Sequence, residues 1–171
     1  IEKATGDWLI FMNAGDTFAD HTVIQQFAEG NYPEDIVFGD QIRGMADGTR
    51  HLWTGPEKVD FLFFYRGGIP HQSTFTRKRV FDQLGGFRED FRIYSDWAHV
   101  ELAVLGHGMS CRHIPLTVSI YDKTGVSSNP EQRHIRKQEI STSRHDLLPL
   151  VIWELAEECL TLRKELDALY S

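Results

Sequence analysis

One short stretch constrains the fold of this 171-residue chain more than any other: the apolar run of residues 8–12 and the polar residues that follow it. A continuous apolar run of this length predicts a strand buried on both faces, as in the centre of a parallel sheet. The sequence NAGD follows at once, at residues 13–16. In open α/β sheets, ligands bind beyond the carboxyl ends of the strands. We therefore expect this strand to present a ligand site at its end.

Strand-like and helix-like segments alternate from there to about residue 121. The pattern indicates an α/β fold with a mixed, mostly parallel sheet flanked by helices and followed by a C-terminal helical extension. A turn at Asp47 and Gly48 also predicts a hairpin between two extended arms. The further predicted strands are 35–40, 74–76, 109–114 and 116–122, and the predicted helices are 20–29, 56–66, 77–86 and 95–106.

The two ends of the chain differ from this pattern. Residues 1–6, IEKATG, are typical of the last turn of a helix that ends in a glycine cap, so we expect the chain to be part of a longer protein. Residues 129–171 predict polar and then amphipathic helices. We expect residues 1–128 to form one α/β domain, with the helical extension packed against it. The alternatives are a homodimer interface and a surface that docks on a membrane or on a partner enzyme, although the acidic ELAEE segment disfavours anionic lipid.

Charge and cysteine content exclude several classes of protein. The formal net charge is −7, from 25 acidic and 18 basic residues, whereas a general nucleic-acid binder carries a basic face. We therefore expect no nucleic-acid partner. Two cysteines in a chain of this length do not indicate a disulfide framework. We expect a cytoplasmic protein, with a peripheral position at the inner face of a membrane as a second option.

The polar residues after the first strand suit a substrate and metal site. Asp16 offers the carboxylate oxygen that hard divalent cations such as Mg²⁺ prefer. Gly15 leaves room for a ligand to approach the backbone, and Asn13 can form hydrogen bonds to a sugar hydroxyl. The same residue types also suit a simple turn between a strand and a helix, which is the alternative interpretation.

Two later segments carry further candidate residues. Asp96 is predicted in the first turn of a helix capped by Ser95, where the helix dipole favours an ionised carboxylate. Such a carboxylate can accept the proton of an attacking hydroxyl. The loop of residues 67–70 places His71 and Gln72 at the start of a strand, where His71 could bind phosphate, sugar or metal. The alternatives are an ordinary helix-start charge at Asp96 and a structural role for His71.

Four separated blocks of the sequence form an ordered set: ATGDWLIFMNAGD (4–16), HQSTFTRKRVFDQLGGFREDF (71–91), YSDW (94–97) and GVSS (125–128). Together they resemble the family 2 glycosyltransferases, which are inverting enzymes of the GT-A fold. The resemblance covers roughly residues 1 to 128 and keeps the family's order. It implies transfer of a sugar from a nucleotide-sugar donor to a hydroxyl acceptor, such as a sugar or a lipid-linked sugar, in bacterial polysaccharide or glycolipid biosynthesis.

The resemblance also implies roles for individual residues. Asp16 matches the metal-binding end of the family's DxD-type motif, which implies Mg²⁺ or Mn²⁺ as cofactor, and Asp96 matches the catalytic base. The segment GGF at residues 85–87 matches a hallmark on the way to that base. The residues that match donor-binding or acceptor-binding positions are Asn13, Gly15, His71, Gln72 and Trp97.

The chain departs from the family pattern in two respects. Asn13 stands where many members have an acidic residue, which bears on the strength of metal binding. The family's N-terminal half, which grips the nucleotide, is missing, so we expect the chain by itself to be inactive. Two other functions stay open. One is a nucleotidyltransferase, which also uses strand-end carboxylates and Mg²⁺. The other is a catalytically inactive domain that serves assembly or carbohydrate binding.

Overall fold

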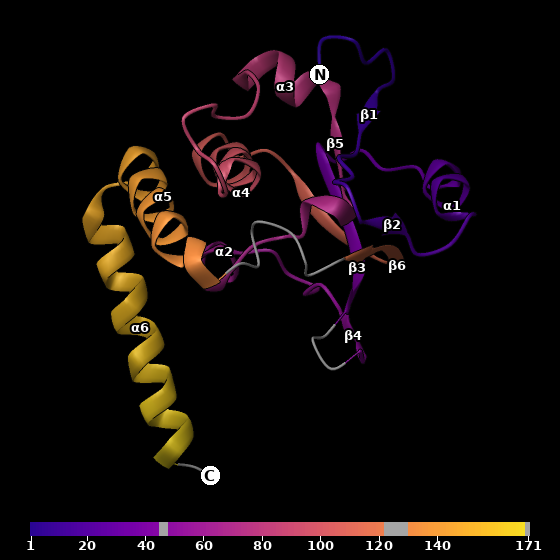
Figure 1. The fold of residues 1–171 in the computed structure, drawn as a ribbon. Coiled ribbons are helices and arrows are strands. Elements are labelled where there is room, and N and C mark those ends of the chain that lie inside the picture. The colour runs from indigo at the N-terminus through magenta and orange to yellow at the C-terminus, as the bar shows by residue number, and fades with distance from the viewer. Residues whose placement is uncertain (45–47, 122–129, 170–171) are drawn as a thin grey trace.

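The structure, a computed structural model, describes residues 1–44, 48–121 and 130–169 (Figure 1). Within these residues, one sheet has the strand order β1-β5-β3-β6-β2, with β4 paired to β3. The strands are β1 (Trp8–Leu9), β2 (Thr17–Phe18), β3 (Ile36–Gly44), β4 (Arg50–Trp53), β5 (Thr74–Arg77) and β6 (Cys111–Tyr121). The helices are α1 (Val23–Glu29), α2 (Phe61–Arg66), α3 (Lys78–Leu84), α4 (Ser95–Glu101), α5 (Arg133–Leu147) and α6 (Leu150–Leu169). Short helical turns lie at His71–Ser73 (η1), Leu102–Gly106 (η2) and Pro130–Gln132 (η4).

Within the apolar run of residues 8–12, only Trp8–Leu9 forms a strand, β1, which lies at the edge of the described sheet. β1 pairs antiparallel with β5, with Trp8 opposite Arg77. The Arg77 guanidinium lies 4.3 Å from the centroid of the Trp8 ring, and that ring meets Phe27 edge-on at 5.2 Å. Within the described residues β1 has one partner strand and runs antiparallel to it, so the expected central parallel position is not observed there.

The sheet is mixed, as expected, but in the described residues it is not mostly parallel. β3 runs parallel to β6 and antiparallel to both β4 and β5. β2 also runs antiparallel to β6. The predicted hairpin is present as β3 and β4, although Asp47 of its turn lies outside the described residues. β5 follows the hairpin and α2 in the chain and runs antiparallel to β3. The alternation of strand-like and helix-like segments in the sequence does not specify the direction of each strand.

A single long strand, β6, replaces the two strands predicted on either side of Pro115. The register to β3 shifts along its length: Phe38 lies opposite His113, whereas Asp40 lies opposite Thr117. Pro115 lies in this irregular stretch. Proline has no backbone N–H to give to a ladder, so within sheets it is tolerated at such irregularities. The proline therefore interrupts the local pairing without ending the strand.

Two hydrophobic cores form on the two faces of the sheet. α1 covers one face, and α2 and α4 lie over the other (Figure 1). Alternate residues of β3 serve the two cores, as expected for a strand whose successive side chains point to opposite faces. The α1 core contains Val23, Phe27, Val37, Phe75, Ile114 and Val118, and the other contains Ile36, Phe38, Phe64, Ile69, Val80, Val100 and Ala103.

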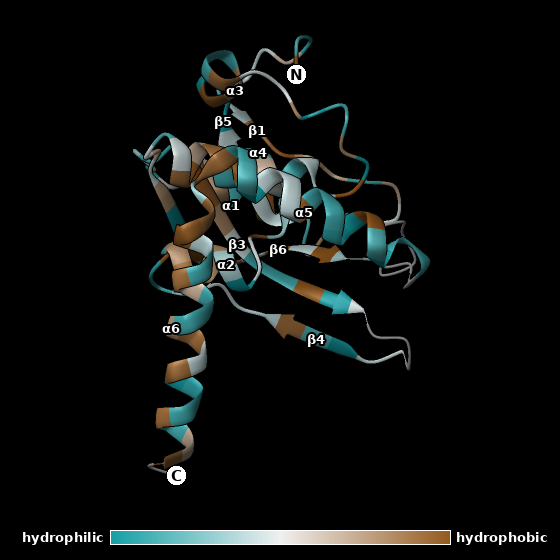
Figure 2. Cartoon of the chain, turned by 90° about the vertical axis from the view of Figure 1, so that its left-hand side faces the viewer, coloured by the Kyte–Doolittle hydropathy of each residue, from teal (hydrophilic) through white to brown (hydrophobic). Residues whose placement is uncertain are grey.

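The two C-terminal helices, α5 and α6, pack against the helices of the α/β domain and against each other. α5 packs against the helical turn η2 that continues α4, and α6 contacts both α2 and α5. Trp153 of α6 is 5% exposed, and its indole N–H donates to the carbonyl of Arg144 at 2.9 Å. The rest of α6 extends well beyond the body of the molecule (Figure 2). The predicted packing of these helices on the domain is therefore observed for the first part of α6.

Several helix boundaries differ from the predictions, and three of the differences concern residues 1–6, α2 and α4. Residues 1–6 form no helix; a turn closes there with a 3.0 Å hydrogen bond from Ala4 N–H to Ile1 C=O. α2 begins at Phe61 rather than at Pro56, because the Asp60 carboxylate accepts the Phe63 N–H at 2.9 Å and caps the helix. Ser95 is not an N-cap acceptor, because its hydroxyl donates to the Arg88 carbonyl at 2.7 Å.

Candidate functional site

A tight turn after β1 carries the first predicted site residues. The Asp16 N–H donates to the Asn13 carbonyl at 3.1 Å and closes the turn. Gly15 has φ of 95°, a left-handed conformation that a residue with a Cβ rarely adopts, so the glycine is required by the backbone. Asn13 and Gly15 are exposed, and Asp16 is partly buried. The segment is therefore a turn, as the alternative interpretation of the sequence predicted. It also presents polar groups to solvent.

Three predicted site residues from distant parts of the chain meet in one hydrogen-bonded line. The Asn13 carboxamide nitrogen lies 2.9 Å from Nε2 of His71. The other imidazole nitrogen of His71, Nδ1, contacts Oδ2 of Asp96. The His71 and Asp96 side chains are 21% and 23% exposed, so the line is set into the surface but open to it. Residues 13, 71 and 96 thus form one polar cluster.

Asp96 is positioned by contacts on both sides of it. Its second oxygen, Oδ1, accepts the Trp97 N–H at 2.8 Å, which fixes the carboxylate at the first turn of α4 as expected. The preceding loop is bound by Glu139 of α5, whose carboxylate accepts the backbone N–H groups of residues 92, 93 and 94 at 2.7, 2.9 and 2.9 Å. Glu139 is 8% exposed. Three hydrogen bonds to one buried charged acceptor make a strong constraint on the loop.

Trp97 lies half-buried between two segments next to Asp96. Its ring contacts the loop of residues 67–70: a Cβ at Gly68 would come within 3.0 Å of the indole. The Arg136 guanidinium of α5 lies 5.4 Å from the ring centroid on a cation–π contact. The absence of a side chain at Gly68 therefore lets the loop before His71 approach α4 closely.

Gln72 takes a different direction from its neighbour His71. It is 4% exposed, and its carboxamide oxygen accepts a hydrogen bond from Gln41 at 3.2 Å. Gln41 also donates to the Ser119 hydroxyl at 3.3 Å and accepts from Arg43 at 3.1 Å. Gln72 thus belongs to a buried polar network between η1, β3 and β6, and its part in substrate binding stays a prediction.

A small pocket adjoins His71 and Asp96 and has aromatic walls. Its space is about 20 Å³, enough for one water molecule. The Phe87 ring, delivered by the predicted GGF segment, packs edge-on against Phe11 and Phe81 at 4.8 and 5.5 Å. Burial lowers the pKa of His99, whose ring stacks on Phe81 at 4.5 Å, although its hydrogen bond to the Gly85 carbonyl opposes the shift. The imidazole of His99 is therefore neutral near pH 7 where it lines the pocket.

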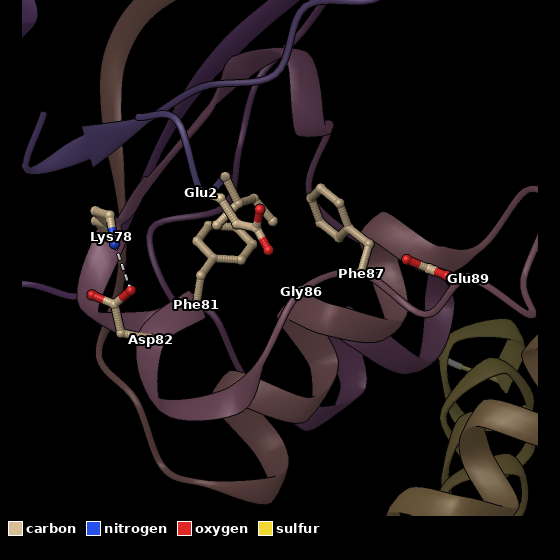
Figure 3. Close-up of a pocket in the computed structure, with 8 residues that line it drawn as sticks. Glu2, Lys78, Phe81, Asp82, Gly86, Phe87 and Glu89 are labelled. Carbon is tan, nitrogen blue, oxygen red and sulfur yellow. Dashed lines mark hydrogen bonds and ion pairs between the residues drawn. The ribbon is translucent and has the colours of Figure 1, made fainter. Parts of the chain in front are cut away.

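A much larger hollow, about 820 Å³, lies beyond those aromatic rings (Figure 3). Phe81 and Phe87 line it as they line the Asp96 pocket, and Glu2 and Glu89 stand at its edge. Lys78 and Asp82 of α3 form a 2.6 Å ion pair on one side. Neither His71 nor Asp96 lines this hollow, so it is separate from the polar cluster.

Two buried carboxylates near the cluster were not found from the sequence. Glu139 occupies a polar helix without a motif, and no sequence signal identifies it. Glu101 is 1% exposed and accepts the Tyr94 hydroxyl at 2.6 Å, while its Oε2 has no partner among the described residues. Burial raises the pKa of Glu101 to about 7, although the Tyr94 hydrogen bond and the charge of Arg144 oppose the shift.

The donor set for a metal ion is small. Among residues 1–44, 48–121 and 130–169, no group of three or more histidine, cysteine or acidic side chains could hold a metal. Asp16 is the carboxylate of the turn and Asn13 a possible amide ligand. Mg²⁺ often binds through one or two carboxylates together with substrate phosphates and water. The residues therefore fit a cation shared with a substrate rather than one held by protein alone.

Comparison with known proteins supports a glycosyltransferase. The chain is 27% identical over 147 residues to a PGL/p-HBAD biosynthesis glycosyltransferase of Mycobacterium bovis strain BCG, a match that covers 83% of this chain and 56% of the relative. It is 29% identical over 141 residues to an uncharacterized glycosyltransferase of Mycobacterium tuberculosis strain H37Rv, covering 77% and 50%. No protein-family profile matches the chain.

Three further observations accompany these similarities. The chain spans about half the length of the curated relatives it matches. In the part of the chain that the structure describes, none of the helices combines the length and the apolar character needed to cross a bilayer. The block GVSS, at residues 125–128, lies outside the described residues.

Proposed function

We propose that this chain is part of a glycosyltransferase that moves a sugar from a nucleotide-sugar donor to a hydroxyl acceptor with inversion at the anomeric carbon. The observation that carries the proposal is the meeting of Asn13, His71 and Asp96, which come from separate blocks of the resemblance to family 2 glycosyltransferases. The similarity to two mycobacterial glycosyltransferases supports the same reaction class. The name of the first of these links that relative to PGL/p-HBAD biosynthesis, and we extend this to a glycolipid or polysaccharide acceptor here.

In the proposed reaction, Asp96 is the general base. Its side chain is 23% exposed beside a pocket that holds about one water molecule, so an acceptor hydroxyl would meet the carboxylate at its open face. The contact with His71 and the N–H of Trp97 orient the carboxylate and keep it from turning away. Accepting the hydroxyl proton as the oxygen attacks makes the acceptor a better nucleophile.

Asp16 is the proposed ligand for Mg²⁺ or Mn²⁺. When bound, such a cation neutralises the negative charge that develops on the nucleoside diphosphate leaving group. The turn that carries Asp16 also carries Asn13, which reaches the cluster through His71. The turn thus connects the proposed donor side of the site to the proposed acceptor side.

Thermal unfolding of the full-length parent protein tests this proposal. Nucleoside diphosphates are added one at a time, each with and without Mn²⁺, and transfer is then assayed with the nucleotide sugar that corresponds to the best ligand. We expect one nucleotide to raise the melting temperature only when the metal is present. Stabilisation by a nucleoside triphosphate and release of pyrophosphate would indicate a nucleotidyltransferase instead. A lack of response to every nucleotide would support a domain for assembly or carbohydrate binding.

A further inference from the structure

The last helix, α6, has two apolar faces with different surroundings. One face is packed: Trp153 and Ala156 are each 5% exposed, and the Trp153 ring lies 5.0 Å from Phe61 and 6.2 Å from Tyr65 of α2. The other face is open to solvent. From Thr161 to Leu169 every residue is exposed, and this part of the helix extends beyond the body (Figures 1 and 2). The packing of the helix on its own domain therefore leaves a second apolar face unused.

The open face follows a coiled-coil repeat. Its residues recur at alternating intervals of three and four, the spacing of positions a and d in a heptad. The large side chains of the set are 39% to 79% exposed, and Cys159 is also exposed. Leucine occupies each d position, and an aliphatic residue or cysteine occupies each a position. The set is Ile152 (a), Leu155 (d), Cys159 (a), Leu162 (d), Leu166 (a) and Leu169 (d).

We propose that this face binds the same face of a second copy of the chain, as a parallel two-stranded coiled coil. A heptad face is self-complementary, because each a or d side chain fills a hole formed by the same face of the partner helix. The packed first half of α6 already fixes the helix, so association does not have to order it, which lowers the cost of binding. The proposal concerns assembly and does not depend on the proposed function.

The charges beside the heptad face determine the parallel direction. Glu158 and Glu165 occupy g positions, and Arg163 occupies an e position. In a parallel pair, a g residue faces the e residue five positions later on the partner, so Glu158 of each copy faces Arg163 of the other. An antiparallel pair would oppose g with g and bring glutamates together. Among the residues described, neither Glu158 nor Arg163 forms an ion pair within the chain, so both charges are available to a partner.

Cross-linking through Cys159 tests both association and direction. In a parallel pair in register, the two Cys159 side chains occupy the same a layer and face each other. Oxidised glutathione would then convert the two thiols to one disulfide, while it is itself reduced to two molecules of glutathione. We expect a covalent dimer on non-reducing gels that disappears with Cys159→Ser. Cys111 is partly buried in β6 and serves as the internal control, because Cys111→Ser should leave the dimer unchanged.

The size of the native protein provides the second measurement. Light scattering or sedimentation over a range of concentrations should show a dimer that Leu162→Glu weakens by about tenfold or more, equivalent to roughly 1.4 kcal/mol. Thr161→Glu is the matched control, because it introduces the same charge at the adjacent exposed position outside the heptad face. Glu158→Arg and Arg163→Glu should each weaken the dimer, and the double exchange should restore it.

Three outcomes would overturn the proposal. The first is a monomer at every concentration with no cross-link through Cys159. The second is a dimer that Glu158→Arg strengthens, which would indicate antiparallel helices. The third is a monomer that binds lipid vesicles through Leu162 and Leu166, which would assign the open face to a membrane surface.

Discussion

Nδ1 of the His71 imidazole contacts Oδ2 of the Asp96 carboxylate, and Oδ1 of the same carboxylate accepts the N–H of Trp97. Each oxygen of Asp96 therefore already has one partner from the protein. A carboxylate oxygen can accept more than one hydrogen bond, so Asp96 keeps acceptor capacity for a substrate hydroxyl while its orientation is fixed. Replacement of Asp96 is therefore the most direct test of the proposed general base.

Asp96→Asn should strongly reduce sugar transfer by the full-length protein. The amide keeps the size of the carboxylate but cannot take a proton, so we expect turnover to fall by about 10²- to 10⁴-fold. Metal-dependent nucleotide binding should stay unchanged. Asp90→Asn is the control, because Asp90 is an exposed carboxylate of the same segment that pairs with Arg88. Near-normal turnover in Asp96→Asn would show that another group is the base.

Asp16→Ala should weaken nucleotide binding only where the metal contributes to it. Titration calorimetry with the best nucleoside diphosphate, in Mn²⁺ and then in excess chelator, measures both conditions. We expect the variant in Mn²⁺ to bind as the unaltered protein does in chelator. Asp20→Ala is the matched control, since Asp20 is an exposed carboxylate after the same turn that accepts hydrogen bonds from Thr22. Equal metal dependence in both variants would remove Asp16 from the metal site.

Glu139→Gln should weaken the hydrogen bonds that hold the loop before Asp96. The amide retains one acceptor oxygen for three backbone N–H groups and loses the charge, so we expect a loss of about 1–3 kcal/mol in the free energy of unfolding. Because these groups lie just before Asp96, turnover should fall while KM for the donor stays unchanged. Lys137→Gln, an exposed change on the same helix, should alter neither. A less stable variant with normal turnover would contradict a positioning role.

The stability of the fold should depend on pH through Glu101. Burial raises the pKa of Glu101 from 4.5 to about 7 in the folded protein, so folding favours its neutral form. This contribution is fully present below about pH 4.5 and is lost as the pH rises through about 7. Glu101→Gln mimics the neutral acid, so the stability of this variant should not fall over the same pH range.

Urea unfolding of both proteins at acid and alkaline pH measures the effect. Relative to Glu101→Gln, the unaltered protein should lose on the order of 3 kcal/mol between roughly pH 5 and pH 8. Other carboxylates titrate equally in both proteins and cancel in the comparison. A constant difference across this range would show that Glu101 is not the titrating group.

The sequence predicted what depends on local patterns. The turn at residues 13–16, Asp96 in the first turn of a helix and the β3–β4 hairpin are each specified within a few residues, and the structure confirms them. The resemblance also selected Asn13, His71 and Asp96, which the fold brings together, whereas their roles in metal and substrate binding stay predictions.

What the sequence could not predict depends on contacts between distant residues. Strand direction is one case, because β1 pairs antiparallel with the distant β5, which places Trp8 opposite Arg77. Glu139 is another, because its three partners lie 45 to 47 residues away and are backbone groups, which leave no mark in the sequence. Two element boundaries were also predicted wrongly. Pro115 lies in a register shift and does not end β6, and α2 begins after its N-cap Asp60 rather than at Pro56.

Phe81 and Phe87 each line both the small Asp96 pocket and the 820 Å³ hollow, so these two rings lie between the two spaces. Shortening either ring would open one space toward the other and give access to Asp96 from a second direction. Accommodation of bulkier acceptors could thus be engineered at these two aromatic positions, without altering any polar group of the cluster.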